Sequence, residues 1–323
     1  MSDQLRFVAT ACALVCDVVF MAALPTALRA EAATPQASVF RLGVDLVNLG
    51  VTVTEKKGGL LVDLHADDFE VLEDGKPQTI RFFAAGDAGR NQPAPDLHLG
   101  LLLDVSESMG GDIKFTRTAA VKFLNTLIDA IDVTVVDFDS EVRVARYGQR
   151  DFARLIERIR RQKTTGMTAL YDAIGVYLDG AGGQTGRKIM LAYSDGGDTR
   201  SAMRWTELQD LLKASDVTVY AIGALDHQSS FARDQGRAVL RSIAELTGGA
   251  AFFPSTLKEL DQIYEKVLAE IRAQYTIGYV STNDKSDGAW RKVEVRIAPK
   301  SRKDAQIRAR RGYFAPYKAP AKP

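Results

Sequence analysis

Cysteine is nearly absent from this sequence. Only two of the 323 residues are cysteines, Cys12 and Cys16, and both lie close to the N-terminus. The rest of the chain therefore cannot form a disulfide, a thiolate metal site or a cysteine nucleophile. Histidine is also scarce, because His65, His98 and His227 are far apart in the sequence, and neither H-E-x-x-H nor G-x-S-x-G occurs. These absences remove the common catalytic patterns and favour a protein that is not an enzyme.

The chain also lacks an excess of charge of either sign. It has 42 Lys and Arg residues against 41 Asp and Glu residues, which gives a net charge of +1. A nucleic-acid partner is therefore not expected. The contents of 46% hydrophobic and 26% charged residues are typical of a soluble globular protein. The length favours two domains, because a single core rarely grows beyond about 250–300 residues.

Long apolar runs are missing except near the N-terminus. Residues 7–24 are mainly apolar, and small residues at 30 and 32 flank Glu31 as in a signal-peptidase site. We therefore predict a signal peptide over residues 1–32 and an extracytoplasmic protein, either secreted or periplasmic. Because Asp17 interrupts the run, two alternatives stay open: an uncleaved N-terminal membrane anchor, and lipidation of Cys12.

The segment 37–88 has the pattern of an N-terminal β-domain. Apolar residues alternate with polar ones, and Asp74-Gly75 between two such runs is a hairpin signal. The expected strands are residues 44–53, 69–72 and 79–83. Residues 84–95 are rich in Gly and Pro and have the composition of a linker.

Residues 96–273 alternate between strand-like and helix-like patterns. This alternation predicts an α/β fold with a doubly wound, mainly parallel six-stranded sheet and right-handed crossovers. The strands that the pattern places are 98–103, 132–138, 188–192, 217–222 and 250–253, and the helices are 114–130, 153–159, 169–178, 205–214, 238–246 and 257–271.

The segment 274–315 returns to strand patterns, at 274–280, 290–297 and 306–313. Three strands with one apolar face are only marginally stable alone. We therefore expect these strands to pair with the N-terminal ones, so that both chain ends build one small β-sandwich-like domain. Residues 316–323 are expected to form a disordered tail.

Hydroxyl and carboxylate side chains follow the first strand of the α/β segment. Asp104, Ser106 and Ser108 occupy alternate positions there, so their side chains can converge at the carboxyl edge of the sheet. Such hard oxygen ligands suit Mg²⁺, Mn²⁺ or Ca²⁺ rather than Zn²⁺. Because two of the ligands are neutral hydroxyls, the cation would keep an affinity for an external anionic group.

Together with Thr168 in T-G-M-T-A-L-Y-D and Asp195 in Y-S-D-G-G-D, this Asp-x-Ser-x-Ser segment resembles the complete metal-ion-dependent adhesion site of the von Willebrand factor type A domain. The resemblance implies that Ser106 and Ser108 bind Mg²⁺ (or Mn²⁺ or Ca²⁺) directly. It implies that Thr168 does so in the open state, and that Asp104 and Asp195 act directly or through water. It further implies that an Asp or Glu carboxylate from a partner protein completes the site. The expected function is therefore metal-dependent protein binding of the adhesion type.

Three neighbouring acids, Asp172, Asp198 and Glu107, could act on the cation indirectly. Explanations that involve no cation are also open for these three acids. Asp172 lies in the first turn of a predicted helix, where an acid stabilises the helix dipole. Solvated loop carboxylates account equally for Asp198 and Glu107.

The flanking segments 67–78 and 310–314 resemble secreted bacterial von Willebrand factor A-related proteins of the Acidobacteria type, for which no reaction or partner is implied. Two alternative functions stay open. The first is a scaffold or assembly factor for an envelope complex. The second is a metal-dependent hydrolase, which the sequence disfavours because Ser106 stands where an aspartyl-phosphate phosphatase has its second Asp, and because 182–188 departs from phosphate-loop spacing.

Overall fold

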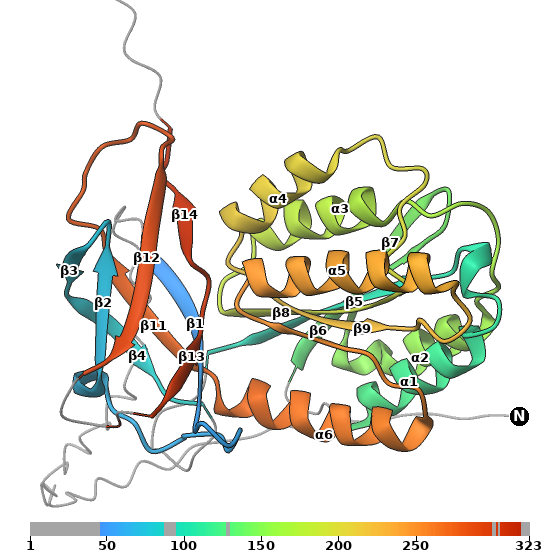
Figure 1. Ribbon diagram of the computed structural model, residues 1–323, viewed down its shortest axis with the longest axis horizontal. Helices are drawn as coiled ribbons and strands as arrows, with labels where there is room; N and C mark the ends of the chain where they lie inside the picture. Colours follow the sequence, from blue (N-terminus) through green and yellow to red (C-terminus); the bar gives the residue numbers. More distant parts are fainter. Residues whose placement is uncertain (1–45, 87–94, 127–129, 299–301, 303, 318–323) are drawn as a thin grey trace, which may run out of the picture. The chain divides into compact units, whose positions relative to one another are not determined.

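The computed structural model describes residues 46–86, 95–126, 130–298, 302 and 304–317 (Figure 1). The predicted signal peptide, residues 1–32, lies outside the described residues, as do residues 318–323 of the expected tail. The start of that tail is placed too early, because Tyr317 still forms an antiparallel bridge with Asp287. Among the described residues we find no helix with the length and hydropathy of a membrane span.

A six-stranded sheet forms the centre of the α/β segment, with the strand order β10-β9-β8-β5-β6-β7. Every neighbouring pair is parallel except β6 and β7, so the predicted doubly wound, mainly parallel sheet is confirmed. Every residue of β5 is buried, as expected for a strand covered on both faces. The strands are β5 (Leu97–Asp104), β6 (Ala130–Phe138), β7 (Val142–Gly148), β8 (Arg187–Ser194), β9 (Thr218–Gly223) and β10 (Ala250–Phe252).

Within this six-stranded sheet, β7 is the strand that the sequence pattern did not place. It pairs antiparallel with β6 at the edge of the sheet, and its side chains are exposed or half-buried. Its sequence carries Arg143 and Arg146 among small and apolar residues, so it lacks the continuous apolar run of a buried strand. Charged side chains on an edge strand discourage pairing with other chains.

Helices cover both faces of this sheet (Figure 1). One face packs against α1 (Ile113–Thr126), α2 (Phe152–Arg161) and α6 (Leu257–Ala273). The other face packs against α3 (Leu170–Gly182), α4 (Trp205–Ala214) and α5 (Ser230–Leu246). Short 3₁₀ helices lie at Ala66–Asp68 (η1), Glu107–Met109 (η2) and Gln149–Asp151 (η3).

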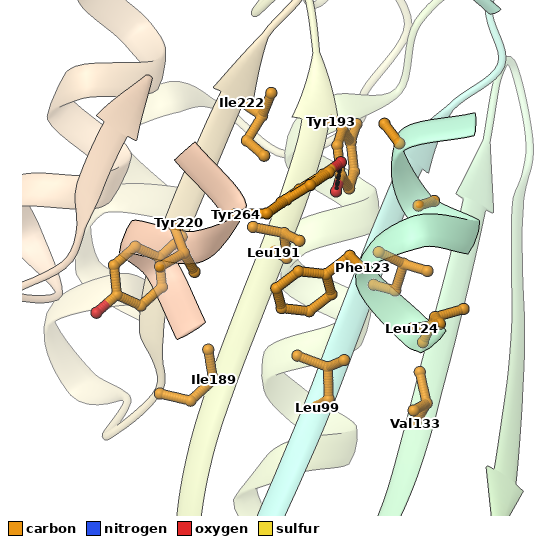
Figure 2. Close-up of a cluster of buried hydrophobic side chains, with 14 of the residues drawn as sticks. Leu99, Phe123, Leu124, Val133, Ile189, Leu191, Tyr193, Tyr220, Ile222 and Tyr264 are labelled. Atoms are coloured by element: carbon orange, nitrogen blue, oxygen red, sulfur yellow. Dashed lines mark hydrogen bonds between the residues drawn. The ribbon is translucent and has the colours of Figure 1, made fainter. Parts of the chain in front are cut away.

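The core between α1, α6 and the sheet contains a buried pair of tyrosines (Figure 2). The hydroxyl groups of Tyr193 on β8 and Tyr264 on α6 lie 2.5 Å apart. Burial raises the pKa of both phenols above their ordinary range, so both stay neutral. Phe123 of α1 packs 5.3 Å from the Tyr264 ring, between centroids. This core fixes β8, whose last residue precedes Asp195.

Helix α5 begins earlier than predicted, at Ser230 instead of residue 238. Its N-cap residue is Ser229, whose side chain accepts a hydrogen bond from the backbone N–H of Ala232. The first turns lie at the surface, and Phe231 is 80% exposed. The apolar periodicity of a buried helix face is therefore missing from this stretch, which explains the error.

Two four-stranded antiparallel sheets form the second part of the fold. Their strand orders are β13-β1-β11-β4 and β14-β12-β2-β3. Each sheet combines N-terminal with C-terminal strands, which confirms the predicted sandwich-like arrangement built from both chain ends. The first sheet contains β1 (Leu46–Thr54), β4 (Ile80–Ala84), β11 (Tyr275–Val280) and β13 (Gln306–Arg308), and the second contains β2 (Phe69–Glu73), β3 (Lys76–Gln78), β12 (Trp290–Ile297) and β14 (Gly312–Phe314).

The turn at Asp74-Gly75 joins β2 to β3, with both residues at positive φ (48° and 80°), as a two-residue hairpin turn requires. The sequence pattern did not place β3, and the expected hairpin partner, residues 79–83, is instead β4 in the other sheet. The expected strand 306–313 is instead two short strands, β13 and β14, which belong to different sheets. A core of aliphatic and aromatic side chains fills the sandwich, including Leu49, Val51 and Tyr275.

Candidate metal centre

Three loops meet at the carboxyl edge of the central sheet. The loop after β5 and the loop before α3 are joined by two backbone hydrogen bonds. Thr165 N–H donates to the carbonyl of Val105 at 2.8 Å, and Glu107 N–H donates to the carbonyl of Gly166 at 3.1 Å. The loop carrying Thr168 is thereby fixed beside the Asp-x-Ser-x-Ser segment.

The third loop, which follows β8, binds the backbone of Thr168. The N–H groups of Thr199 and Arg200 donate to the Thr168 carbonyl at 2.9 Å and 3.0 Å, and the Thr168 N–H donates to the hydroxyl of Thr199 at 3.0 Å. Thr168 is itself buried. Hydrogen bonds within the chain therefore tie together the segments that carry Asp104, Thr168 and Asp195.

Asp104 ends β5 and is completely buried. Its Oδ1 accepts hydrogen bonds from the backbone N–H and the hydroxyl of Ser106, at 3.0 Å and 2.5 Å. Its Oδ2 accepts a bond of 2.6 Å from the hydroxyl of Ser194. The hydroxyls of Ser106 and Ser108 lie 3.0 Å apart, with Ser106 buried and Ser108 exposed. The alternate spacing therefore does bring these three side chains together, and it leaves the Ser108 side open to solvent.

Ser106 could have been explained as a helix cap. It is indeed the N-cap residue of η2, but its side chain makes no capping hydrogen bond. The hydroxyl is directed to Asp104 and Ser108 instead. Capping therefore does not account for this serine.

Asp195 lies in a tight turn directly after β8. Its Oδ1 accepts a hydrogen bond from Gly197 N–H at 2.9 Å, and its Oδ2 accepts one from Nε2 of Gln228 at 2.7 Å. Gly196 has a φ of 80°, which favours glycine. A Cβ on Gly236 of α5 would lie 2.0 Å from the Asp195 carbonyl oxygen. Helix α5 thus packs directly against the backbone of the turn.

The electrostatics of this edge are unfavourable for two carboxylates. Burial, together with the negative charge of Asp195, raises the pKa of Asp104 to about 7, against the opposing hydrogen bonds from Ser106 and Ser194. Among the described residues, the hydrogen bonds to both carboxylates come from hydroxyl, amide and backbone N–H groups, which are all neutral. Within the described part of the chain, no Lys or Arg is therefore hydrogen-bonded to this acidic pair.

The donor set fits a small divalent cation. Hydroxyl and carboxylate oxygens are the ligands that Mg²⁺ prefers, and a positive ion beside two mutually repelling carboxylates would remove the repulsion. Within the described part of the chain no group of three or more His, Cys, Asp and Glu residues could hold a metal ion. The candidate centre differs from such a group because three of its five side chains carry hydroxyls.

Two of the neighbouring acids have structural roles. Asp172 accepts hydrogen bonds from the backbone N–H groups of Ala202 and Met203, both at 2.9 Å. Asp198 accepts bonds from Tyr171 N–H at 3.1 Å and from the Ser201 hydroxyl at 2.6 Å. Both carboxylates therefore fasten the loop after β8 to the first turn of α3.

The third neighbouring acid, Glu107, is exposed and holds the loop before α3 through its backbone N–H, which donates to the carbonyl of Gly166. Among the described residues, the Glu107 side chain makes no hydrogen bond or ion pair that would give it a structural role like those of Asp172 and Asp198.

Sequence reasoning missed two residues of the centre, Ser194 and Gln228. Ser194 is completely buried, bonds Asp104, and accepts a bond of 3.0 Å from Gly196 N–H. Gln228, in the loop after β9, bonds Asp195. The only signal for Ser194 in the sequence is its position before Asp195, and nothing local distinguishes Gln228.

Comparison with known proteins gives one family. The model described as von Willebrand factor type A domain matches residues 98–266, just over half of the chain. Such domains are commonly protein-interaction and adhesion modules, usually without enzymatic activity. No curated protein matches the chain.

Solved structures similar to the chain include three bacterial proteins. One is a von Willebrand factor type A protein from Catenulispora acidiphila, with 12% identity over 86% of this chain and 75% of that one, and a TM-score of 0.45. Another is the von Willebrand factor domain of the type V pilus tip protein Mfa5 from Porphyromonas gingivalis, with 13% identity over 61% of this chain and 100% of that one, and a TM-score of 0.44. The third is an aerotolerance-related membrane protein from Bacteroides fragilis, with 13% identity over 54% of this chain and 98% of that one, and a TM-score of 0.43.

The family assignment rests on the match over residues 98–266, and the sheet order and helix layers described above agree with it. The chain belongs to the von Willebrand factor type A domain family.

Proposed function

We propose that this protein is a protein-binding module of the adhesion type whose binding depends on a divalent cation. The residues that would hold Mg²⁺, or Mn²⁺ or Ca²⁺, are Asp104, Ser106, Ser108, Thr168 and Asp195. The observation that carries the proposal is the buried Asp104 carboxylate, which is repelled by Asp195 and, among the residues that the structure describes, receives hydrogen bonds from neutral donors alone. A bound cation would supply the missing positive charge.

The composition of the centre favours a partner that provides a carboxylate. Neutral hydroxyls from Ser106, Ser108 and Thr168 leave a cation more electrophilic than a carboxylate cage would. Ser108 is exposed while Ser106 is buried, so the open side of the centre lies at Ser108. An Asp or Glu side chain of a partner protein is the ligand that fits this side. The proposal assigns none of these residues as a nucleophile or a general base, so it includes no catalysis.

We place this function outside the cytoplasm, secreted or periplasmic. The support for this location is the leader-like sequence of residues 1–32, with membrane attachment through that segment as the alternative.

The cation requirement is tested by thermal unfolding in Mg²⁺ and in EDTA. A ligand that binds only the folded state at about 100 times its Kd adds about 2.7 kcal/mol. We expect Mg²⁺ to raise the Tm of the wild type and not that of the Ser106→Ala/Ser108→Ala variant. Ser255→Ala is the matched control, because its hydroxyl bonds the exposed Asp226 and not the centre. An equal Mg²⁺ response in wild type and double variant would exclude the proposed cation site.

Asp104→Asn sharpens this test because we expect it to stabilise the protein in EDTA and to abolish the stabilisation by Mg²⁺. Replacing the carboxylate by an amide removes the repulsion from Asp195 while keeping the shape of the side chain. We expect this variant to be more stable than wild type in EDTA and to gain nothing from Mg²⁺. A variant less stable than wild type in EDTA would mean that the repulsion between Asp104 and Asp195 costs less than the hydrogen bond from Ser194 or Ser106 that an amide nitrogen cannot accept.

Partner binding is tested by pull-down from extracytoplasmic extracts in Mg²⁺ and in EDTA. We expect a set of partners that is lost both in EDTA and in the Ser106→Ala/Ser108→Ala variant. Partners that bind equally under both conditions would favour the scaffold function over the cation-dependent one.

A further inference from the structure

Positive charge is concentrated in the segment 143–163, which forms most of β7, the 3₁₀ helix η3 and α2. The segment contains eight Lys and Arg residues but only two acids, although the net charge of the whole chain is +1. The basic residues are Arg143, Arg146, Arg150, Arg154, Arg158, Arg160, Arg161 and Lys163, and the acids are Asp151 and Glu157. A surface with such a local excess attracts groups of opposite charge, unless the protein neutralises the excess itself.

Part of this positive charge neutralises buried acids of β6. Arg143 Nε donates to Oδ2 of Asp137 at 2.8 Å, and Arg158 Nε donates to Oδ1 of the same carboxylate at 2.9 Å. Arg146 donates to the buried carboxylate of Asp132. These three arginines therefore have a structural role, because each compensates a charge that the sheet buries.

The remaining basic side chains of the segment face the solvent. The side chains of Arg154 and Arg161 are 81% and 78% exposed. Each pairs with an acid one helical turn away, Asp151 at 3.3 Å and Glu157 at 2.8 Å. Such exposed pairs contribute little stability, so both arginines stay available to an external anionic group. Three more exposed basic side chains form no hydrogen bond or ion pair with the described residues, and they are Arg150, Arg160 and Lys163.

A groove of about 480 Å³ lies along this part of the surface. It is lined by Tyr147 of β7 and by Ala153, Arg154, Glu157, Arg158 and Arg161 of α2. Residues three and four positions apart lie on the same face of a helix, so Arg154, Arg158 and Arg161 form a row. At about 1.5 Å per residue this row is about 10 Å long. The groove therefore offers a row of guanidinium groups to a ligand that lies along α2.

The chemistry and the shape of this groove fit the carboxylates of a protein segment. Arginine binds a carboxylate through two parallel N–H···O bonds. It binds phosphate groups in the same way, but a membrane presents its phosphates on a flat surface, whereas the groove is concave. A membrane-binding helix also needs exposed apolar side chains. All residues of α2 are described, and its large apolar side chains pack against the core, including Phe152 and Ile156.

We propose that the groove along α2 binds an acidic segment of a partner protein, whose Asp and Glu side chains are spread over about 10 Å along the helix. Arg154 and Arg161 bind the carboxylates directly. Arg150, Arg160 and Lys163 add attraction at longer range, which speeds association. This binding goes beyond the proposed function, because it needs no cation and uses no residue of the candidate metal centre.

The test measures the fluorescence anisotropy of a labelled oligoglutamate peptide with the full chain in EDTA at low ionic strength. We expect Arg154→Gln/Arg161→Gln to bind the peptide about tenfold more weakly than wild type, because two exposed ion pairs with the peptide are lost. Both arginines are exposed, so this variant should keep the Tm of the wild type. Added salt should weaken the wild-type binding through screening. Unchanged affinity in the variant would overturn the inference.

Arg296→Gln/Arg302→Gln is the matched control. It removes the same charge from the chain, and its two arginines also pair with exposed acids, Glu294 at 2.7 Å and Asp63 at 2.6 Å. These arginines do not line the groove. The control should bind the peptide as wild type does. An equal loss in both double variants would mean that the peptide responds to net charge alone, and would contradict a specific groove.

Two further measurements separate this groove from a membrane surface and from the cation site. Sedimentation with phosphatidylglycerol vesicles should leave the wild type in the supernatant. Vesicle binding that is lost in Arg154→Gln/Arg161→Gln would assign the groove to anionic lipid and overturn the proposal. In EDTA the Ser106→Ala/Ser108→Ala variant should bind the peptide as wild type does. Peptide binding that appears only in Mg²⁺ would place the peptide at the cation site, which also contradicts the proposal.

Discussion

The hydroxyl of Ser194 donates a hydrogen bond of 2.6 Å to Oδ2 of Asp104, across 90 positions of the sequence. This bond joins the carboxyl ends of two neighbouring strands, β8 and β5. The same hydroxyl accepts a bond of 3.0 Å from Gly196 N–H in the turn that carries Asp195. Ser194 therefore orients one acid of the centre and shapes the turn of the other.

Ser194→Ala should weaken cation binding without removing a ligand. Loss of a hydrogen bond that orients a ligand commonly lowers metal affinity by about 10–100-fold. Leaving the buried Oδ2 of Asp104 without its donor should also lower the free energy of unfolding by about 1–3 kcal/mol. Isothermal titration with Mg²⁺ and urea unfolding measure the two effects. Wild-type Mg²⁺ affinity in this variant would show that Ser194 does not position Asp104.

Gly236→Ala tests the packing of α5 against the turn at Asp195. Ala favours a helix interior over Gly by about 1 kcal/mol, so helix propensity alone predicts stabilisation. The new Cβ would, however, lie 2.0 Å from the Asp195 carbonyl oxygen, so the helix or the turn must shift. We expect a loss of about 3 kcal/mol or more in urea unfolding, together with weaker Mg²⁺ binding.

Gly180→Ala in α3 is the matched control for that helix substitution. A Cβ at Gly180 would have no atom within 4 Å. This variant should therefore gain about 0.5–1 kcal/mol from helix propensity and bind Mg²⁺ as wild type does. If Gly236→Ala behaved in the same way as Gly180→Ala, the close approach of α5 to Asp195 would be wrong.

Asp139 gives a pH-dependent prediction. Burial alone would raise its pKa, but hydrogen bonds from Arg143, Glu141 N–H and the Thr165 hydroxyl outweigh burial and lower the pKa below its usual value of 3.8. Because the folded-state pKa is depressed, the stabilisation is complete above the unfolded pKa of about 3.9. It is lost as the pH falls through the lower folded-state pKa.

Asp139→Asn should remove this stabilisation. Arg143 donates to both carboxylate oxygens, at 3.0 Å and 3.1 Å, but is itself partly exposed, so we expect a cost of about 1–2 kcal/mol near pH 7. The difference between wild type and variant should shrink below about pH 4, as measured by urea unfolding across this range. A difference in the free energy of unfolding that stays constant across this pH range would mean that the Asp139 charge does not contribute to stability.

Fragments of the β-sandwich should not fold alone. Within the described residues β1 pairs with the strands β11 and β13, and β4 pairs with β11, so an N-terminal fragment of residues 44–86 would keep only the β2–β3 hairpin and the isolated bridge between Thr54 and Leu60. An isolated two-stranded hairpin is at best marginally stable in water. We expect circular dichroism of this fragment to show no cooperative melting. A cooperative transition would contradict the conclusion that both sheets need strands from both ends of the chain.

The sequence predicted the class of fold better than it predicted the edge of the sheet and the ends of the helices. Continuous apolar runs such as 98–103 and helical periodicities such as 114–130 report burial against both faces of a sheet, and they were enough to predict a doubly wound α/β fold. The pattern did not place β7, because an edge strand with Arg143 and Arg146 is only partly buried. The start of α5 was missed for the same reason.

For the candidate centre, the sequence by itself determined which oxygen-bearing residues follow the strands, because strand ends and the alternation of side chains are local properties. Only the tertiary structure decided that Ser194 and Gln228 bond the two acids, that Asp172 and Asp198 fasten a loop, and that Gly236 packs on the turn. These contacts join segments far apart in the chain. They depend on the order of strands in the sheet, which no local pattern encodes.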